Sequence, residues 1–413
     1  QQRQQRIVQD FLKTFKSKND LFNWEVNGVG IGVDIYETYL RICSKPTLDF
    51  ADPQLIKMIE LGVSLFVFWE DYINKGNVKA VVVSHDVYIY ENILNRLCYI
   101  HQIPVYLPNV IGGCRANQPY SIYDPLFRRY PSMFKALTPA EQEEGFKIAE
   151  RQLQKRLGGA IGVDMPYSTK SAFRKESSGQ RVFRESDKTK VLICSHCFYD
   201  NPQAYGKMLF PDFYEWICFL GEMTLKTDYD WYIKMHPDPL PGTEEIIKGI
   251  IAKYPKITFV PPSTSHLQMI SEGLNFIFTV YGSVGHELAA LGVQVVNAGY
   301  NPHYGYDFNW HPRNLQEYEQ MILSLPTLKK EINRKDIYAF YYMHYYYTIA
   351  DDLYLKSYRE YIAETPNSKD THSKPYEYFL EHLTPAKHQK ICGCLINFIE
   401  SGKKYYFSRG PQD

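Results

Sequence analysis

The chain has 413 residues, with 46 Lys and Arg against 46 Asp and Glu, and therefore a formal net charge of zero. A zero net charge excludes the strong positive field on which nucleic-acid binders and binders of anionic membranes depend. The 45% hydrophobic and 22% charged residues exclude a disordered or fibrous protein, and the length suffices for two or three domains.

The first 20 residues carry apolar side chains at helical spacing, which predicts an amphipathic helix. Docking onto the body of the protein and a peripheral contact with a membrane are both open for this helix. The sequence has no run of about 18 apolar residues and no signal peptide, so we expect a soluble, cytoplasmic protein. The eight cysteines are scattered, and we expect reduced thiols without a role in metal binding.

The next part of the chain predicts a parallel sheet with helices on both faces. Its expected strands are 28–36, 79–84 and 103–107, separated by helices near 53–75 and 89–101. A polar, Ser-rich stretch at 165–189 then marks a boundary between two domains.

A second and clearer alternation of strands and helices follows this boundary. The expected strands are 190–196, 230–235, 257–261, 275–280 and 293–298, and the expected helices are 210–225, 243–254, 265–272 and 284–292. This pattern predicts a doubly wound α/β domain of Rossmann type, whose ligands bind at the carboxyl ends of the strands. We therefore expect an N-terminal Rossmann-like domain at 1–170, a linker at 171–189, a second Rossmann-like domain at 190–311, and a helical region without strands at 312–413 that packs across both domains.

Two polar groups are predicted at the carboxyl end of this second sheet. Lys234 and His236 end a strand that Pro237 stops, and two cations there suit a phosphate or a carboxylate, unless His236 only caps the loop. The second group is the loop with Gly282, Ser283 and Val284.

Ser283 is expected to cap the following helix, whose free N–H groups attract an anion. Glu287 lies one turn further on. It suits either ribose hydroxyls or the positive end of the helix dipole.

The segment from FVPPSTSHLQMI through NFIFTVYGSVGHELAALGVQVVNAGYNPHYG resembles the core of the capsule-polysaccharide biosynthesis family. That family includes bacterial Kdo (3-deoxy-manno-octulosonate) transferases of the GT-B fold, and KMHP at 234–237 is similar to its Lys-x-His-Pro strand end. The likeness covers about residues 190–310 and, more weakly, 28–110. It implies two doubly wound domains that face a central cleft, with a helical C-terminal extension.

The resemblance also implies a function in bacterial surface-polysaccharide synthesis, of capsule, O-antigen or lipopolysaccharide. The expected reaction is retaining transfer of Kdo from CMP-Kdo to a glycan or glycolipid acceptor, either in the cytoplasm or peripherally at the inner membrane. Lys234, His236, Ser283 and Glu287 would then bind the nucleotide monophosphate. An inverting transferase that uses another nucleotide sugar and a non-catalytic glycan-binding module are the alternatives, and the oligomeric state is open.

Two carboxylates are candidates for the chemistry. Asp200 follows the first strand of the second domain and matches the family's proposed nucleophile, although Ser195-His196 replaces the family's usual Gly-Gln. Asp86 ends a first-domain strand and is a candidate general base. For both residues an Asx turn that caps a loop is the alternative.

Further acidic residues are candidates for metal and acceptor binding. Asp228 and Asp230 form a D-x-D pattern, but they precede a strand, and one phosphate can be held without a metal, so we expect no essential divalent metal. Glu37 and Arg41 lie four positions apart and form either an ion pair or an acceptor contact.

Overall fold

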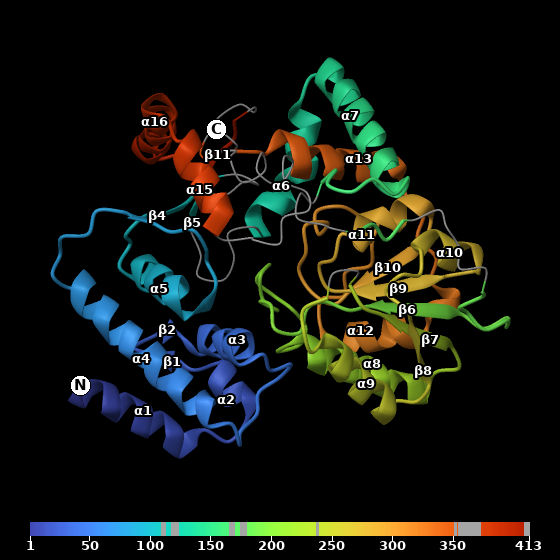
Figure 1. Cartoon of the computed structure of the whole chain (residues 1–413), viewed down its shortest axis with the longest axis horizontal. Coiled ribbons are helices and arrows are strands. Elements are labelled where there is room, and N and C mark those ends of the chain that lie inside the picture. Colours follow the sequence, from blue (N-terminus) through green and yellow to red (C-terminus); the bar gives the residue numbers. More distant parts are fainter. Residues whose placement is uncertain are drawn as a thin grey trace.

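A five-stranded parallel sheet organises the larger part of the molecule. The computed structural model describes residues 1–108, 113–116, 124–164, 170–173, 180–236, 239–350, 353 and 373–408. The strands of this sheet are β6 (Lys190–Cys194), β7 (Asp230–Lys234), β8 (Ile257–Val260), β9 (Phe276–Thr279) and β10 (Gln294–Asn297). Their spatial order is β10-β9-β6-β7-β8, and all neighbours are parallel (Figure 1). The predicted α/β class with a doubly wound parallel sheet is confirmed, and its strand order reverses between β6 and β9.

Both faces of this sheet are buried, as the apolar runs of its strands require. Ile193 and Phe278 belong to one apolar cluster, whereas their neighbours Leu192 and Ile277 belong to another. The first cluster includes residues of α8 (Phe213–Lys226), α9 (Thr243–Lys253) and α12 (Leu315–Leu323), and the second includes residues of α10 (His266–Ser271) and the segment after α11 (Val284–Glu287). Alternate side chains along each strand therefore point to opposite helical layers.

The N-terminal part is mainly helical. Its elements are α1 (Gln2–Thr14), α2 (Lys18–Phe22), β1 (Glu25–Val26), β2 (Val29–Gly30), α3 (Gly32–Cys43), α4 (Pro53–Ile73), β3 (Val81–Val82), η1 (Tyr88–Asn92), α5 (Ile93–Ile100), β4 (Val105–Leu107), β5 (Gly113–Ala116), α6 (Asp124–Ala136) and α7 (Pro139–Leu157). The predicted helices at 53–75 and 89–101 are present, whereas α6 and α7 were not predicted.

The predicted strand at 28–36 is wrong, because β2 is two residues long and α3 begins at Gly32. The apolar residues Ile31, Ile35 and Tyr39 recur at helical spacing, and all three are buried. A Cβ atom at Gly32 would lie 1.7 Å from the Leu21 carbonyl oxygen, so only glycine permits this close packing of α2 and α3.

A small mixed sheet replaces the predicted parallel sheet of the N-terminal part. β3 and β4 are parallel, but β5 pairs antiparallel with β4 and with β11 (Tyr405–Tyr406). The expectation that no strand lies beyond residue 312 is therefore wrong. β11 follows the C-terminal helices and forms one edge of the sheet, in the order β11-β5-β4-β3.

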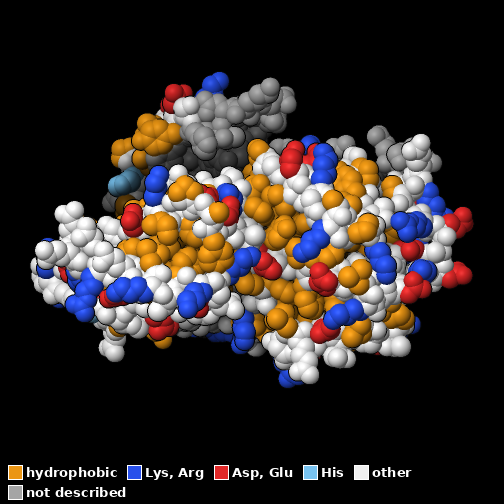
Figure 2. Space-filling model, turned by 90° about the horizontal axis from the view of Figure 1, so that it is seen from below, with side chains coloured by type: hydrophobic (Ala, Val, Ile, Leu, Met, Phe, Trp, Pro, Cys, Tyr) orange, Lys and Arg blue, Asp and Glu red, His pale blue; other side chains and the backbone are white. Residues whose placement is uncertain are grey.

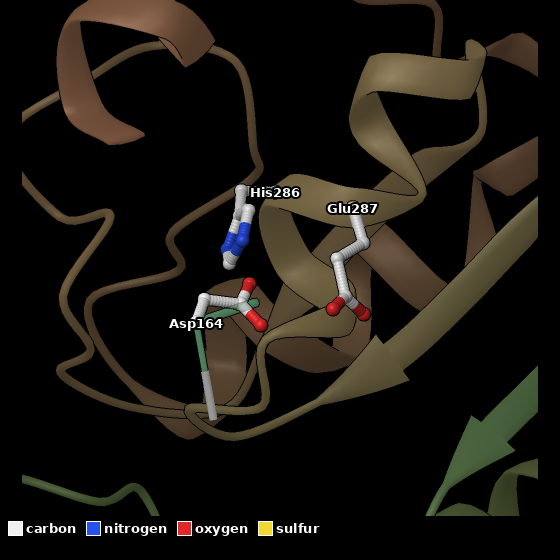
Figure 3. A group of neighbouring side chains, drawn as sticks. All are labelled: Asp164, His286 and Glu287. Atoms are coloured by element: carbon white, nitrogen blue, oxygen red, sulfur yellow. The ribbon is translucent and has the colours of Figure 1, made fainter. Parts of the chain in front are cut away.

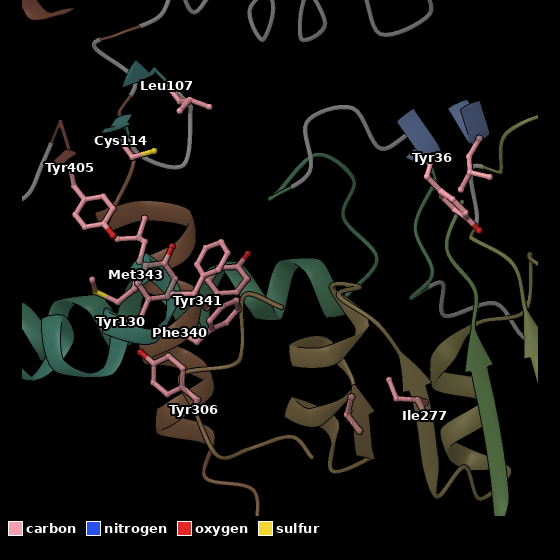
Figure 4. Packing of buried hydrophobic residues seen from close by; sticks show 14 of the residues in the cluster. Tyr36, Leu107, Cys114, Tyr130, Ile277, Tyr306, Phe340, Tyr341, Met343 and Tyr405 are labelled. Atoms are coloured by element: carbon pink, nitrogen blue, oxygen red, sulfur yellow. The ribbon is translucent and has the colours of Figure 1, made fainter. Parts of the chain in front are cut away.

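The C-terminal region contacts both parts of the chain. Its remaining elements are η3 (Leu325–Thr327), α13 (Arg334–Tyr342), η4 (Met343–Tyr347), α15 (Ser373–His382) and α16 (Pro385–Ser401). α12 packs on α8, and α13 packs on α6 and α7, where Tyr130, Phe340 and Tyr341 are buried together (Figure 4). One apolar cluster runs from the N-terminal helices through α13 to one face of the parallel sheet.

The N-terminal helix docks on the protein, which favours one of its two predicted roles. α1 lies along α4, with Val8 and Phe11 buried and Arg3 paired with Glu70 and Asp71. Within the described ranges, no helix is long and apolar enough to span a membrane. The face in Figure 2 shows Lys and Arg side chains interspersed with Asp and Glu, so this face carries no field of one sign (Figure 2).

Candidate functional site

His196 lies at the carboxyl edge of the parallel sheet, where the strand order reverses between β6 and β9. It follows β6, and its Nε2 accepts a hydrogen bond from the Val280 N–H at 3.1 Å, just beyond the end of β9. Its ring stacks on Phe213 at 4.7 Å and lies 4.6 Å from the Tyr281 ring. Desolvation lowers the pKa of His196 to about 3, so the ring is neutral. This residue was not predicted, and it links the loop after β6, which carries Asp200, to the loop after β9.

Lys234 ends β7 as a buried cation. Its residue surface is 2% exposed, and burial lowers the pKa of its ammonium group to about 8. Within the part of the chain that the structure describes, no carboxylate forms an ion pair with it. His236 is exposed two residues further on, and Pro237 lies outside the described residues.

The loop after β9 differs from its predicted form. The helix expected at 284–292 is the four-residue α11 followed by the 3-10 helix η2 (Ala289–Leu291). Ser283 precedes α11, but its side chain makes no capping hydrogen bond there, because its backbone is already helical at φ −57°. At Gly282, a Cβ atom would lie 2.8 Å from Thr279 Oγ1, to which the Gly282 N–H donates at 3.2 Å. Val284 is half-buried at the start of α11.

Glu287 lies in a buried ion pair that was not predicted. Arg156 Nε from α7 donates to Glu287 Oε1 at 2.8 Å, and Glu287 is 1% exposed. Ribose binding by Glu287 stays a prediction, and it would require a nucleotide to share this carboxylate with Arg156. No pattern in the sequence marks this pair, because 131 positions separate the two residues.

Asp200 lies where the loop after β6 meets the N-terminal helices. Its carboxylate is exposed, accepts a hydrogen bond from Tyr88 Oη at 3.0 Å, and lies 3.6 Å from Arg41 Nη1. Tyr88 has φ 62°, a left-handed conformation that is rare for an aromatic residue. Strained backbone of this kind clusters at functional sites. Tyr88 was not predicted, and no pattern in the sequence marks its positive φ.

Glu37 on α3 holds the residues that directly follow Asp200. Its Oε1 accepts the Gln203 N–H at 2.8 Å, and Asn201, with its amide nitrogen turned toward the carboxylate, donates to both Glu37 oxygens at 2.6 Å. Burial raises the pKa of Glu37 to about 8, although the Gln203 N–H acts in the opposite direction. Arg41 lies near Asp200 and not near Glu37, so the predicted ion pair between Glu37 and Arg41 is not formed. The predicted acceptor contact stays a prediction.

A cavity of about 500 Å³ lies between α2, α3 and the loop at 201–211, next to Glu37. Glu37 and the half-buried Asp86 both line it. Asp34 and Arg96 form a buried ion pair in its wall, with Arg96 Nε 2.6 Å from Asp34 Oδ2. The cavity has the size of a ligand site and presents polar groups that suit hydroxyls.

The D-x-D residues lie away from this edge. Asp230 begins β7 and is therefore at the amino-terminal edge of the sheet, where it accepts a hydrogen bond from Ser186. Asp228 pairs with Lys188. Neither is near the carboxyl ends of the strands, where ligands of such sheets bind.

No family model and no curated protein match the sequence. Among solved structures, the chain is similar to the Thermosulfurimonas dismutans KpsC beta Kdo 2,4 transferase, with 14% identity and a TM-score of 0.38 over 66% of this chain and 80% of that chain. It is also similar to the beta Kdo 2,7 transferase of the same KpsC, with 12% identity and a TM-score of 0.36 over 65% of this chain and 78% of that chain. It is also similar to the Neisseria meningitidis UDP-GlcNAc 2-epimerase bound to UDP-GlcNAc, with 10% identity and a TM-score of 0.26 over 74% of this chain and 81% of that chain. Identities and TM-scores this low assign neither an activity nor a residue role.

Proposed function

We propose that the chain is a GT-B glycosyltransferase of bacterial surface-polysaccharide synthesis that transfers Kdo from CMP-Kdo to a glycan acceptor with retention of configuration. The observation that carries the proposal is the pair of carboxylates at the carboxyl edge of the sheet. Asp200 is exposed there, and the buried Glu37 holds the backbone that follows it, beside a cavity of about 500 Å³. Two carboxyl groups in unlike environments are typical of sites that divide nucleophile and acid–base roles.

The donor phosphate is assigned to the ends of β7 and β9. Lys234 is a buried cation for which the described residues supply no ion-pair partner, and His236 is exposed beside it. A monophosphate would compensate the charge of Lys234 and accept hydrogen bonds from His236 and the loop at Gly282 and Ser283. Because these groups act on one phosphate, no divalent metal is assigned to the donor.

The transfer then proceeds in two displacements. An Asp200 oxygen attacks the anomeric carbon, the bond from that carbon to the phosphate oxygen breaks, and CMP leaves with the electron pair. An acceptor hydroxyl in the cavity attacks the same carbon, its proton passes to Glu37, and the bond to Asp200 breaks, which restores the carboxylate. A base with a raised pKa accepts that proton more readily, and Glu37 has a pKa near 8.

An inverting transferase is the second candidate, because Asp86 lines the same cavity as Glu37. In that reaction Asp86 takes the proton from the acceptor hydroxyl, which displaces CMP directly, and Asp200 forms no bond to the sugar.

Calorimetry with CMP, UDP, GDP and ADP tests the donor assignment. We expect selective binding of CMP, and His236→Ala should weaken it by about 1–3 kcal/mol, the cost of losing a hydrogen bond to a charged group. The exposed His101 gives a matched control, since His101→Ala should leave the affinity unchanged. Selective binding of UDP would mean that the donor is a UDP-sugar and not CMP-Kdo. Binding of none of the four, together with no cleavage of CMP-Kdo, would favour the non-catalytic glycan-binding module.

A further inference from the structure

A buried cluster of metal-ligating side chains joins the end of α7 to α11. Asp164, His286 and Glu287 bring one ligand atom each to within 4.8 Å of one another. Asp164 comes from the loop after α7, whereas His286 and Glu287 are consecutive on α11. In Figure 3 the imidazole and the two carboxylates point toward one another (Figure 3). His286 and Glu287 are each 1% exposed, and the Asp164 side chain is 0% exposed although its residue as a whole is half-buried.

His286 presents one nitrogen that the protein does not use. Its Nδ1 lies 3.0 Å from His303 Nε2, whereas its Nε2 has no hydrogen-bond partner among the described residues. A buried polar nitrogen without a partner is rare in native proteins and calls for an explanation by a ligand or an ion. When Nδ1 donates its proton to His303, Nε2 carries the lone pair that a metal needs, and the contact fixes the ring.

Arg156 contacts both carboxylates. Its Nε donates to Glu287 Oε1 at 2.8 Å and lies 3.6 Å from Asp164 Oδ1. Hydrogen-bonded carboxylates of this kind are typical of the surroundings of metal sites.

We propose that Asp164, His286 and Glu287 bind one divalent transition-metal ion, and that this ion fastens the loop after α7 to α11. One imidazole nitrogen and two carboxylate oxygens form a donor set that suits Zn²⁺. The ion has a structural role, because its ligands are buried. Its test needs no substrate, so the outcome for this ion and the outcome for the proposed transfer reaction are measured separately.

The test uses the full chain after dialysis against EDTA and then metal-free buffer. Titration with Zn²⁺ in a calorimeter should give one bound equivalent, and the midpoint of thermal unfolding should rise by several degrees. Asp164→Asn and His286→Ala should each weaken Zn²⁺ binding at least tenfold and abolish the rise. His344→Ala is the matched control: it removes another buried histidine, 6% exposed, and should lower stability but keep Zn²⁺ binding.

Co²⁺ identifies the ligands if a variant fails to fold. The wild-type Co²⁺ complex should show d–d bands without a thiolate charge-transfer band. The exposed His388 lies 3.6 Å from Cys392 Sγ and is the competing surface site, so a thiolate band would overturn the proposal. Loss of Zn²⁺ binding in His388→Ala, unchanged binding in both Asp164→Asn and His286→Ala, or no binding by wild type would overturn it as well.

Discussion

Tyr88 donates a hydrogen bond from its hydroxyl to Asp200 Oδ1 at 3.0 Å, although 112 positions separate the two residues. The contact links η1 of the N-terminal part to the loop that follows β6. It is made from a backbone conformation with φ 62°, which costs a non-glycine residue of order 1–3 kcal/mol. Packing elsewhere must supply this energy, so the position of the hydroxyl against the carboxylate is closely determined.

Tyr88→Phe removes the hydroxyl and keeps the ring. We expect the rate of CMP release from CMP-Kdo to fall about tenfold. A hydrogen bond to a charged group contributes about 1.5–3 kcal/mol. Because Asp200 is exposed, the lower end of this range applies, and it corresponds to about a tenfold change. The midpoint of thermal unfolding should stay within a few degrees of wild type. Tyr90→Phe is the control, since Tyr90 is 52% exposed and lies on the same segment. Equal rates in wild type and Tyr88→Phe would remove the hydroxyl from the reaction.

Glu37→Gln should change the pH dependence of transfer. A general base acts in its deprotonated form, so the wild-type rate should rise with pH and level off above the Glu37 pKa of about 8. Glutamine keeps the size but takes up no proton from the acceptor, so the variant should be slow and should lack this rise. The measurement is the rate of transfer to a glycan acceptor between pH 6 and pH 9.

Glu25→Gln is the matched control for Glu37, because Glu25 lines the same cavity and is exposed. Its rate should follow the wild-type pH profile. A Glu37→Gln variant that keeps the rise near pH 8 would show that Glu37 only positions the loop after Asp200, and Asp86 would then be the base to test.

The parallel sheet was predictable because its strands are apolar on both faces and alternate with amphipathic helices. The error at 28–36 has a specific cause. Ile31, Ile35 and Tyr39 fit a helical period, but the β-branched residues of the segment 28–36 favoured a strand. The choice was made by the packing of Gly32 against Leu21, a tertiary contact that no local pattern contains. β11 was not predicted, because a strand of two residues is too short to show the alternation of apolar and polar side chains.

The site was predictable only where it depends on strand ends. Lys234 ends β7 and Asp200 follows β6, and these strands are adjacent and parallel, so the presence of both residues at one edge follows from the topology. The contacts of Glu37 with Asn201 and Gln203, and that of Arg156 with Glu287, join segments more than 100 positions apart. Such pairs are set by how helices pack on the sheet, which the spacing of residues along one segment does not encode.

The buried histidines should make the fold sensitive to acid. His266, His286, His303 and His344 are each at most 6% exposed, and desolvation lowers the pKa of each well below 6.5, for His344 to about 3. The folded state therefore binds fewer protons than the unfolded state below about pH 6.5, and stability is lost as the pH falls.

At pH 5 the loss should amount to about 2 kcal/mol for each histidine that stays neutral in the folded state. Urea unfolding at pH 8, 6.5 and 5 measures it. His344→Gln removes one titrating group and should flatten the dependence below pH 6 by about 1.4 kcal/mol per pH unit. Equal slopes in wild type and variant would mean that His344 is protonated in the folded state.

Asp200→Asn separates the retaining from the inverting reaction. Asparagine keeps the size of the side chain and can still accept the Tyr88 hydrogen bond, but it is a poor nucleophile. Transfer should therefore fall by several orders of magnitude while CMP binding persists. Wild type given CMP-Kdo without acceptor should gain the mass of one sugar on the peptide that contains Asp200, and the variant should not. If Asp200→Asn stays nearly as active as wild type while Asp86→Asn is inactive, then Asp86 is the base of an inverting transferase. If both variants keep full activity, transfer requires neither Asp200 nor Asp86, and Glu37 is the remaining carboxylate to test.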